Sequence, residues 1–332
     1  MQLNHAASAA RRGLPACRYL ETVGHLDASG RGGVRHQGAA ALRQDGQPIA
    51  RVAAHPQRDR AGSSRRQLAE VEVAAAARQA GLQVTVLETL DLPLLRVLGR
   101  EMAQVFADLH RSNGVSLRLG VRIEEVLSSG STTTPQATTP QACGVRLADG
   151  ARIDADAILA GIGAVPRTGL ASDAGLEVSD GIVTTAALRT SDPDIFAAGD
   201  VASAFHPLLG EHVRVEHWAN ALKQPAVAAA AMLGQEASYE DLPYFYTDQY
   251  DLGMEYVGHV SGGGYDQVVV RGDLEARQFI AFWLKEGRVK AGMNVNVWDV
   301  TDSVKALIRS GHPVDAHALA DPGTALDDLL PG

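Results

Sequence analysis

The stretch of residues 190–220 constrains the fold more than any other part of this 332-residue chain. It contains an apolar run, residues 195–198, that is followed at once by Gly199 and Asp200. Four consecutive apolar residues are typical of a buried strand in a parallel sheet, and ligands bind at the carboxyl ends of such strands. A glycine there admits a ligand close to the backbone, and a carboxylate can accept hydrogen bonds from hydroxyl groups. The stretch therefore predicts an α/β fold with a ligand site at Gly199 and Asp200.

Composition and charge exclude several classes of protein. A chain of this length with 45% hydrophobic residues can bury a substantial core and form two or three domains. The net charge of −9 disfavours binding to nucleic acid or to an anionic membrane, and no apolar stretch is long enough to span a bilayer. The amino terminus lacks the apolar core of a signal peptide, so we expect a cytoplasmic protein. The sequence does not indicate an oligomeric state.

Metal and disulfide chemistry have little support. The only cysteines are Cys17 and Cys143, which are too few for a disulfide framework or a Cys-rich metal site. The eleven histidines are scattered without a paired spacing, so we expect no metal site.

A helix that leads into a strand is predicted directly after residue 68. Residues 69–80 are rich in helix formers, Gly81 is the expected C-terminal cap, and residues 83–87 alternate as a strand that ends at Glu88. In a dinucleotide-binding βαβ unit, an acidic residue at this position accepts hydrogen bonds from the adenine ribose of NAD. Glu88 is therefore a candidate NAD-binding residue, and a solvated strand end is the alternative.

The next segments also read as alternating helix and strand. Apolar residues at three- and four-residue spacing predict a helix over residues 93–110 that stops at Asn113 and Gly114. Residues 115–127 and 143–153 read as strands around a Ser/Thr/Pro-rich insert, which we expect to be a mobile hairpin tip.

A further buried strand over residues 155–163 ends in Gly161, Ile162 and Gly163. Its glycines would admit a cofactor backbone, although a tight turn explains them equally well.

The carboxyl-terminal third has a different character. Residues 218–233 predict an Ala-rich helix that Pro225 either kinks or begins, and an aromatic and Gly-rich antiparallel sheet is expected beyond Gly234. An amphipathic helix over residues 300–310 should close this domain. Trp298 is a candidate contact for a protein partner, because a tryptophan at a domain rim suits an interface.

Several long motifs resemble the NAD(P)H-dependent ferredoxin reductases that serve Rieske dioxygenases and cytochrome monooxygenases. Residues 188–201 and 215–221 resemble the second FAD-contacting segment of this family, and residues 248–258 resemble its reductase C-terminal domain. Residues 14–22 are similar to the connector that leads into the NAD domain. The family is part of the FAD-dependent pyridine nucleotide-disulfide oxidoreductase superfamily.

The resemblance implies an α/β fold of FAD/NAD(P)-binding Rossmann-like three-layer domains, incomplete here, followed by an α+β reductase C-terminal domain. We expect four parts: an irregular segment over 1–68, an NAD-binding domain over 69–158, the second FAD segment over 159–243 and the C-terminal domain over 244–332.

The resemblance also implies the activity: electrons pass from NAD(P)H through FAD to a [2Fe–2S] ferredoxin. The implied FAD-binding residues are Gly199, Asp200, Val201, His217 and Trp218. The implied NAD(P)H-binding residues are Glu72, Glu88, Gly161, Ile162 and Gly163. A negative charge at Glu88 favours NADH, since it would repel the 2′-phosphate of NADPH.

The chain departs from the family pattern in its phosphate-binding glycines. Residues 1–68 contain no Gly-x-Gly-x-x-Gly fingerprint for FAD, and the NAD fingerprint positions hold Arg65, Gln67 and Glu70. Glu70 would set a negative charge against the pyrophosphate, so NAD affinity should fall. Two alternatives follow: a truncated or frameshifted non-catalytic remnant that binds no flavin, and a disulfide reductase, which the lack of a Cys-x-x-x-x-Cys pair disfavours.

Overall fold

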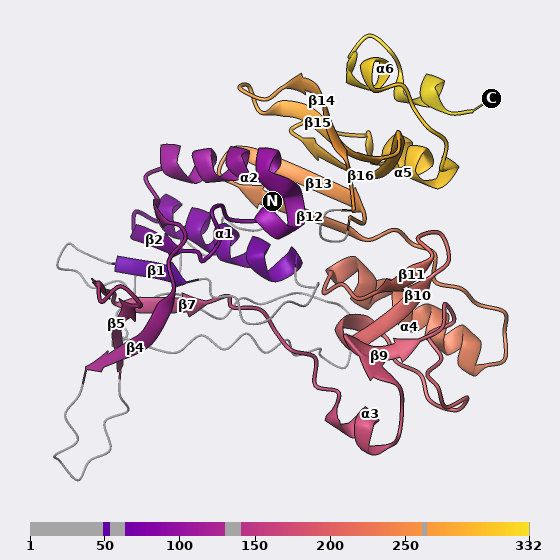
Figure 1. Cartoon of the computed structure of the whole chain (residues 1–332), viewed down its shortest axis with the longest axis horizontal. Helices are drawn as coiled ribbons and strands as arrows, with labels where there is room; N and C mark the ends of the chain where they lie inside the picture. Colours follow the sequence, from indigo (N-terminus) through magenta and orange to yellow (C-terminus); the bar gives the residue numbers. More distant parts are fainter. Residues whose placement is uncertain (1–48, 54–63, 130–140, 261–263, 332) are drawn as a thin grey trace. The chain divides into compact units, whose positions relative to one another are not determined.

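The computed structural model describes residues 49–53, 64–129, 141–260 and 264–331 (Figure 1). The described residues form two compact units. The first contains residues 73–93 and 107–161 together with strand β1, and the second contains residues 64–72, 94–106 and 162–331. Two helices, α1 (Ser64–Gln79) and α2 (Leu95–Ser112), contribute to both units. Within the described ranges, no helix combines the length and apolarity needed to cross a membrane.

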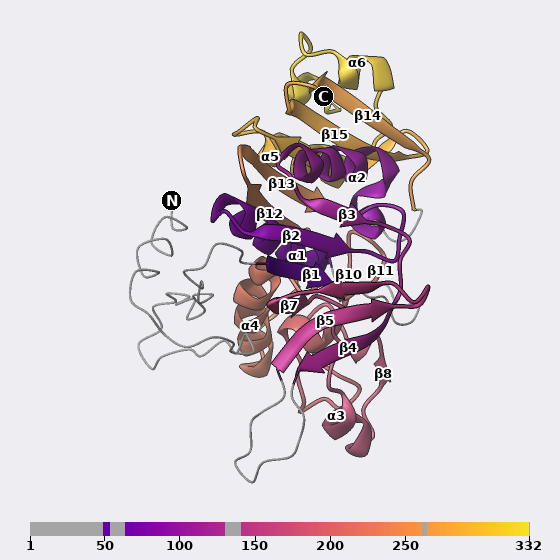
Figure 2. The ribbon, with the colours of Figure 1, turned by 90° about the vertical axis from the view of Figure 1, so that its left-hand side faces the viewer.

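The first unit is built on a four-stranded parallel sheet in the order β3-β2-β1-β7 (Figure 2). Its strands are β1 (Ile49–Ala53), β2 (Gln83–Leu87), β3 (Ser116–Arg118) and β7 (Ala157–Ala160). From β1 the chain adds β2 and then β3 on one side. It later adds β7 on the other side of β1, as in dinucleotide-binding folds. The predicted strand at residues 83–87 is confirmed, and the apolar run after residue 48 supplies the central strand.

The core of this unit lies between the sheet and α1. Ala74 of α1 is fully buried and packs with Val84 and Val86 of β2. Leu82 and Val115, which flank the strands, complete this cluster. The helix ends as expected before Gly81, which has a φ of 85°.

A three-stranded antiparallel sheet completes the first unit: β4 (Ile123–Ser129), β5 (Gln141–Leu147) and β6 (Arg152–Asp154). The pairing of β4 with β5 confirms the predicted hairpin. Its expected mobile tip falls mainly on residues 130–140, which lie outside the described residues.

The second unit begins with a small sheet in the order β11-β10-β9-β8. Its strands are β8 (Val178–Ser179), β9 (Gly181–Thr184), β10 (Ala202–His206) and β11 (Glu211–Val213). The short helix α3 (Gly169–Asp173) precedes them, the 3-10 turn η2 (Gly199–Val201) leads into β10, and helix α4 (Trp218–Met232) follows β11. The predicted helix over residues 218–233 is confirmed. It continues through Pro225, which lies inside α4.

The strand predicted for residues 195–198 is wrong. These residues form an irregular segment whose single β-bridge joins Phe196 to Arg189. Thr190 directs the chain here, because its N–H donates to the carbonyl of Ile195 and its hydroxyl lies 3.0 Å from the same oxygen. A strand needs a neighbouring strand for its backbone groups, and no described strand pairs with this run in the parallel manner expected.

The carboxyl-terminal part of this unit is a five-stranded antiparallel sheet in the order β12-β13-β16-β15-β14. Its strands are β12 (Tyr244–Gln249), β13 (Leu252–Gly258), β14 (Gln267–Asp273), β15 (Gln278–Lys285) and β16 (Arg288–Val295). Helix α5 (Thr301–Ser310) follows, and it buries Val304, Leu307 and Ile308 in the core. Two short elements, α6 (Ala316–Ala320) and η3 (Leu326–Leu329), end the chain. The predicted sheet and amphipathic helix are both confirmed.

Helix α2 is interrupted at one position that its apolar spacing did not reveal. Gly99 has a φ of 72° and a ψ of 174°, so the segment consists of two helical pieces joined at this residue. The hydroxyl of Tyr265 occupies the space that a Cβ at Gly99 would take. The break therefore belongs to the packing of α2 in the second unit, and only glycine fits it.

Candidate functional site

The turn at Gly199 and Asp200 lies where an apolar segment meets the first residues of β10. Gly199 is buried and has a φ of 79°, a left-handed conformation that other residues rarely adopt. A Cβ built at Gly199 would meet no atom within 4 Å, so one side of this turn is open space. The side chain of Asp200 is exposed. The turn is therefore open at its glycine and has an exposed acidic residue beside it; its role as a ligand site stays a prediction.

Two side chains hold the backbone of this turn. Oε1 of Gln224 accepts a hydrogen bond of 2.7 Å from the N–H of Gly199, and this contact is buried. Nη1 of Arg214 donates to the carbonyl oxygen of Asp200 over 3.2 Å. The N–H of Gly199 and the carbonyl of Asp200 thus both have hydrogen-bond partners within the protein. Asp200 is the exposed middle residue of η2, and Val201, half-buried, is its last residue.

Arg214 is the centre of a buried ion cluster. Its side chain is 3% exposed, and it pairs with Oε1 of Glu216 at 2.9 Å and with Oδ1 of Asp180 at 3.2 Å. Burial alone would lower the pKa of Arg214, but the hydrogen bonds and charges of Glu216 and Asp180 raise it above its ordinary value. The guanidinium is therefore charged at any pH at which the protein is folded.

Gly181 makes room for this cluster. Its φ is 102°, and a Cβ at this position would lie 2.8 Å from Cδ of Arg214 and 2.5 Å from the carbonyl oxygen of Val201. Both contacts are closer than side-chain carbons tolerate. Strand β9 must consequently begin with glycine for Arg214 to reach the turn.

His217 and Trp218 stand at the start of α4 in different surroundings. His217 is 2% exposed, and its ring lies 5.0 Å from the ring of Phe245. Phe245 in turn stacks on Tyr256 with an interplanar angle of 15°. Trp218 is 51% exposed. Trp218 is therefore open to a ligand or partner, whereas His217 belongs to an aromatic row inside the second unit.

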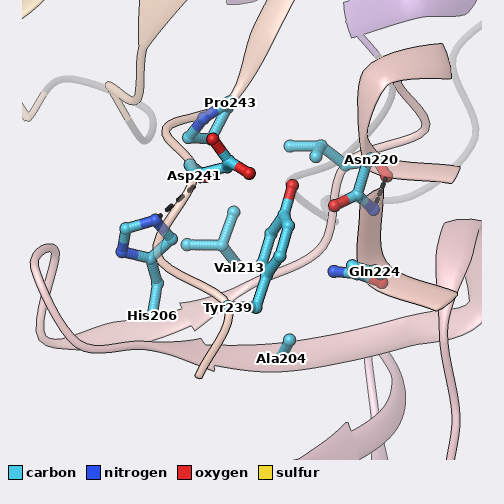
Figure 3. A pocket seen from close by; sticks show the side chains of 9 residues that line it. Ala204, His206, Val213, Asn220, Gln224, Tyr239, Asp241 and Pro243 are labelled. Atoms are coloured by element: carbon cyan, nitrogen blue, oxygen red, sulfur yellow. Dashed lines mark hydrogen bonds between the residues drawn. The ribbon is translucent and has the colours of Figure 1, made fainter. Parts of the chain in front are cut away.

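A small hollow lies behind the turn, and Figure 3 shows its lining. It is lined by Ala204, His206, Val213, Val215, Asn220, Gln224, Tyr239, Asp241 and Pro243. Nε2 of His206 lies 3.2 Å from the carbonyl oxygen of Asp241. Burial lowers the pKa of His206 and raises that of Tyr239, so both side chains are neutral at pH 7. Gln224 separates this hollow from Gly199.

Glu88 and Gly161 occupy equivalent places in the first unit. Ala53 at the end of β1 is in register with Leu87 of β2 and with Ala160 of β7. Because these strands are parallel, Glu88 and Gly161 follow at the same edge of the sheet, on either side of β1. This edge is where dinucleotides bind in such sheets.

The carboxylate of Glu88 is partly engaged by its own turn. Glu88 is 5% exposed, and its Oε1 accepts hydrogen bonds from the N–H of Leu90 at 2.9 Å and from the hydroxyl of Thr89 at 3.2 Å. These contacts orient the side chain at the end of β2. The sequence placed Glu88 correctly at the strand end, but it did not indicate this burial.

Ile162 and Gly163 belong to the second unit, whereas Gly161 ends the first. Ile162 is 54% exposed, and Gly163 has a φ of 85° with no atom within 4 Å of a built Cβ. The predicted strand over residues 155–163 is therefore shorter than expected, because β7 covers only Ala157–Ala160. The Gly-Ile-Gly segment is an open connection.

Glu72 is bound by a hydroxyl from the C-terminal sheet. The hydroxyl of Thr247 donates to Oε1 of Glu72 over 2.6 Å, and Nε2 of Gln249 donates to the same hydroxyl over 3.2 Å. Thr247 and Gln249 are both 1% exposed. Sequence reasoning singled out Glu72 but missed these two partners.

The position expected for an NAD pyrophosphate loop does not fit that ligand. Helix α1 begins at Ser64, so Arg65, Gln67 and Glu70 are all helical rather than part of a glycine loop. Glu70 is 4% exposed. A pyrophosphate must approach the backbone closely at the first turn of a helix, which the fingerprint glycines permit, and Glu70 adds a negative charge near that turn.

Arg214 and Gln224 are site residues that sequence reasoning missed. The Val-Arg-Val-Glu text of residues 213–216 contains a signal, since alternation in an extended segment places Arg214 and Glu216 on one side. Gln224 gave no signal, because a glutamine in a helix usually faces solvent.

The fold combines a parallel sheet of the dinucleotide-binding kind with an antiparallel C-terminal sheet, which is the architecture of a nucleotide-dependent reductase class. Comparisons with known proteins agree. Residues 70–225 match the family described as pyridine nucleotide-disulphide oxidoreductase, and residues 244–330 match the reductase C-terminal family. Residues 70–225 therefore form a domain of the pyridine nucleotide-disulphide oxidoreductase family, and residues 244–330 form a reductase C-terminal domain.

Individual relatives are ferredoxin reductases. The chain is 39% identical to the ferredoxin–NAD(+) reductase component of an anthranilate 1,2-dioxygenase system from Burkholderia cepacia, over 78% of this chain and 61% of that protein. It is 37% identical to putidaredoxin reductase from Pseudomonas putida, over 78% of this chain and 60% of that protein. The chain thus spans about three fifths of the length of these curated relatives.

Solved structures give the same result. The covalent complex of putidaredoxin reductase with putidaredoxin matches with a TM-score of 0.74 and 34% identity, over 85% of this chain and 63% of that one. The ferredoxin reductase of the CYP199A2 system from Rhodopseudomonas palustris matches with a TM-score of 0.72 and 31% identity, over 84% and 64% of the two chains.

Proposed function

We propose that this chain acts in a FAD-dependent oxidoreductase that passes electrons from NAD(P)H through FAD to a [2Fe–2S] ferredoxin. The observation that carries the proposal is the open, glycine-based turn at Gly199 with the exposed carboxylate of Asp200 beside it. Relatives that share this part of the chain are ferredoxin reductases by name. The non-catalytic remnant weighed as an alternative receives no support from these comparisons.

The described residues suggest how the flavin would be held. Asp200 would accept hydrogen bonds from hydroxyls of the ribityl chain, and Gly199 with Val201 would let the ligand approach the backbone. Trp218, which is exposed, and the buried His217 would stand by the ring. When bound, FAD supplies the conversion between two-electron transfer from a nicotinamide and one-electron transfer to an iron–sulfur protein.

The nicotinamide nucleotide has a less complete site among the described residues. We propose that Glu88 binds the adenine ribose, that Glu72 lies near the nicotinamide, and that Gly161, Ile162 and Gly163 line the nucleotide. Residues 65–70 lack the glycines of a pyrophosphate loop and include the acidic Glu70, so no step is assigned to them. We also propose that the parts are an NAD-binding domain at 69–158, a FAD segment at 159–243 and a C-terminal domain at 244–332.

Spectroscopy and a coupled assay test the proposal. The purified chain, incubated with FAD and passed through a desalting column, is expected to retain the absorption bands of bound flavin. With NADH and putidaredoxin as the probe ferredoxin, the bands of the iron–sulfur cluster should bleach. Blocking the thiols should leave this reaction unchanged, because no cysteine pair takes part. A chain that holds FAD but reduces no ferredoxin would contradict the proposed acceptor.

A further inference from the structure

The peptide groups on both sides of the Gly199–Asp200 turn are held by side chains from elsewhere in the second unit. Gln224 takes the N–H of Gly199, and Arg214 takes the carbonyl of Asp200. We propose that Gln224 and Arg214 form a turn clamp, which fixes the backbone of this turn and so positions Asp200 for the hydroxyls of the FAD ribityl chain. This inference rests on the proposed function and adds two positioning residues to it.

Gln224 is a buried polar side chain on a helix whose adjacent residues are exposed. Its neighbours on α4, Lys223 and Pro225, are exposed, whereas Gln224 is 2% exposed. Burying a polar amide is unfavourable unless it is hydrogen-bonded, and the 2.7 Å contact with Gly199 provides that bond. The turn gains an acceptor that water cannot replace, because the contact is buried.

The contact also determines what the turn can offer a ligand. The N–H of Gly199 already has a partner in Gln224, so it is not the group that receives the ligand. The open side of Gly199 and the exposed residue Asp200 lie next to this bonded N–H. The clamp therefore directs recognition towards ligands with hydroxyl donors, which suits a polyol chain better than a bare phosphate.

The guanidinium of Arg214 binds the carbonyl group at the other end of the turn. Its Nη1 lies 3.2 Å from the carbonyl oxygen of Asp200 and 2.9 Å from Glu216, while Nε lies 3.2 Å from Asp180. A planar guanidinium makes these contacts from fixed directions, which an ammonium group on a flexible stem cannot reproduce. The position of the Asp200 carbonyl is thereby tied to β11 and to the residue before β9.

A turn fixed in advance binds its ligand without a further loss of conformational entropy. The clamp links the turn to α4 through Gln224 and to the small sheet through Arg214. Loosening either contact should therefore weaken FAD binding even though neither side chain is placed against the ligand.

The test compares three variants of the full chain. Gln224→Met keeps the length of the side chain but removes the acceptor, and Gln224→Glu keeps an acceptor oxygen. Lys223→Met alters the adjacent exposed position and serves as the matched control. FAD affinity is measured by fluorescence titration, and hydrogen exchange of the peptide that contains Gly199 reports on the turn without any ligand. Thermal unfolding verifies that each variant is folded.

Gln224→Met is expected to bind FAD about tenfold more weakly, as for the loss of one buried hydrogen bond. The amide of Gly199 should exchange about tenfold faster by the same reasoning. Gln224→Glu should restore the protection of this amide, and Lys223→Met should behave as the unaltered chain.

Unchanged affinity and exchange in a folded Gln224→Met variant would overturn the clamp while leaving the proposed function intact. If Gln224→Met does not fold, loss of protection in Gln224→Glu would overturn it instead. Failure of the unaltered chain to take up FAD would contradict the proposed function, and with it the role of the clamp in ligand binding, whatever the exchange data show.

Discussion

The hydroxyl of Thr247 donates a hydrogen bond to Oε1 of Glu72 over 2.6 Å and joins residues that are 175 positions apart in the sequence. The same hydroxyl accepts a hydrogen bond from Gln249. Strand β12 thus supplies a buried polar pair that orients the carboxylate proposed to lie near the nicotinamide. The C-terminal sheet would therefore contribute to the proposed nicotinamide site through this hydrogen bond.

Replacing Thr247 by Val should lower the free energy of unfolding by about 1–3 kcal/mol, because Glu72 loses a donor and Gln249 loses an acceptor at a buried position. Val matches the shape of Thr, so packing changes little. Urea unfolding measures the effect, and Thr247→Ser, which keeps the hydroxyl, is the control. Equal stability of the Val and Ser variants would show that the hydrogen bonds contribute nothing.

The stability of the second unit should depend on pH through Glu255. Burial alone would raise the pKa of Glu255, but hydrogen bonds from Tyr244, Asn294 and Thr301 lower it below its ordinary value of 4.5. A carboxyl group whose pKa is lower in the folded state stabilises the fold above its unfolded pKa, and this contribution disappears as the pH falls through the folded pKa.

Glu255→Gln should therefore be less stable than the unaltered chain at pH 7, by about 1 kcal/mol, since solvent screens this partly exposed charge and reduces the usual contribution of charged hydrogen bonds. The difference should shrink as the pH falls below 4.5. Urea titrations at pH 7 and pH 4 test this, with Glu275→Gln at an exposed position as the control. A difference that is the same at both pH values would exclude an effect of the charge.

Replacing two glycines near the turn by alanine should lower the stability of the fold by different amounts. At Gly199 the positive φ is the only obstacle, since no atom lies within 4 Å of a built Cβ, so Gly199→Ala should cost about 1 kcal/mol. At Gly181 the added carbon would also meet Val201 and Arg214, so the loss should be clearly larger. Denaturant unfolding of the two variants decides this, and equal losses would mean that the crowding at Gly181 is relieved without cost.

FAD uptake should quench tryptophan fluorescence chiefly through Trp218. The chain has three tryptophans: Trp283 is 1% exposed in the core, while Trp218 and Trp298 are each about half exposed. Only Trp218 adjoins the segment proposed to hold the flavin. Trp218→Phe should remove most of the quenching in a FAD titration, and Trp298→Phe should leave it unchanged. The opposite ranking would place the flavin elsewhere.

The sequence predicted most elements because their signals are local. Residues 83–87 alternate, residues 218–233 are rich in alanine, and the aromatic strands after residue 243 are separated by clear turns. The run at residues 195–198 was wrongly assigned because a strand also requires a partner, which a local pattern does not show. The break at Gly99 was hidden for a similar reason, since the apolar spacing continues across it.

The candidate site was predictable only in part. Gly199 and Asp200 carry a long and specific motif, and the structure places them as an open turn with an exposed carboxylate. Of the clamp residues, Gln224 gave no signal in the sequence, and the alternation at residues 213–216 indicated only that Arg214 and Glu216 share a side. The roles of the two clamp residues depend on distances of 2.7 Å and 3.2 Å between atoms that are 25 and 14 residues apart, and local periodicity contains no such information.

The dissociation constant of FAD for the chain and for its Asp200→Ala variant tests the central claim most directly. Removing a carboxylate that accepts hydrogen bonds from the ribityl chain should weaken binding by about tenfold or more, while the exposed position leaves the stability of the fold nearly unchanged. Asp192→Ala, in the loop before the turn, is the control. Saturable FAD binding that Asp200→Ala weakens and Asp192→Ala does not is the predicted result. Equal affinities, or no binding by the unaltered chain, would contradict it.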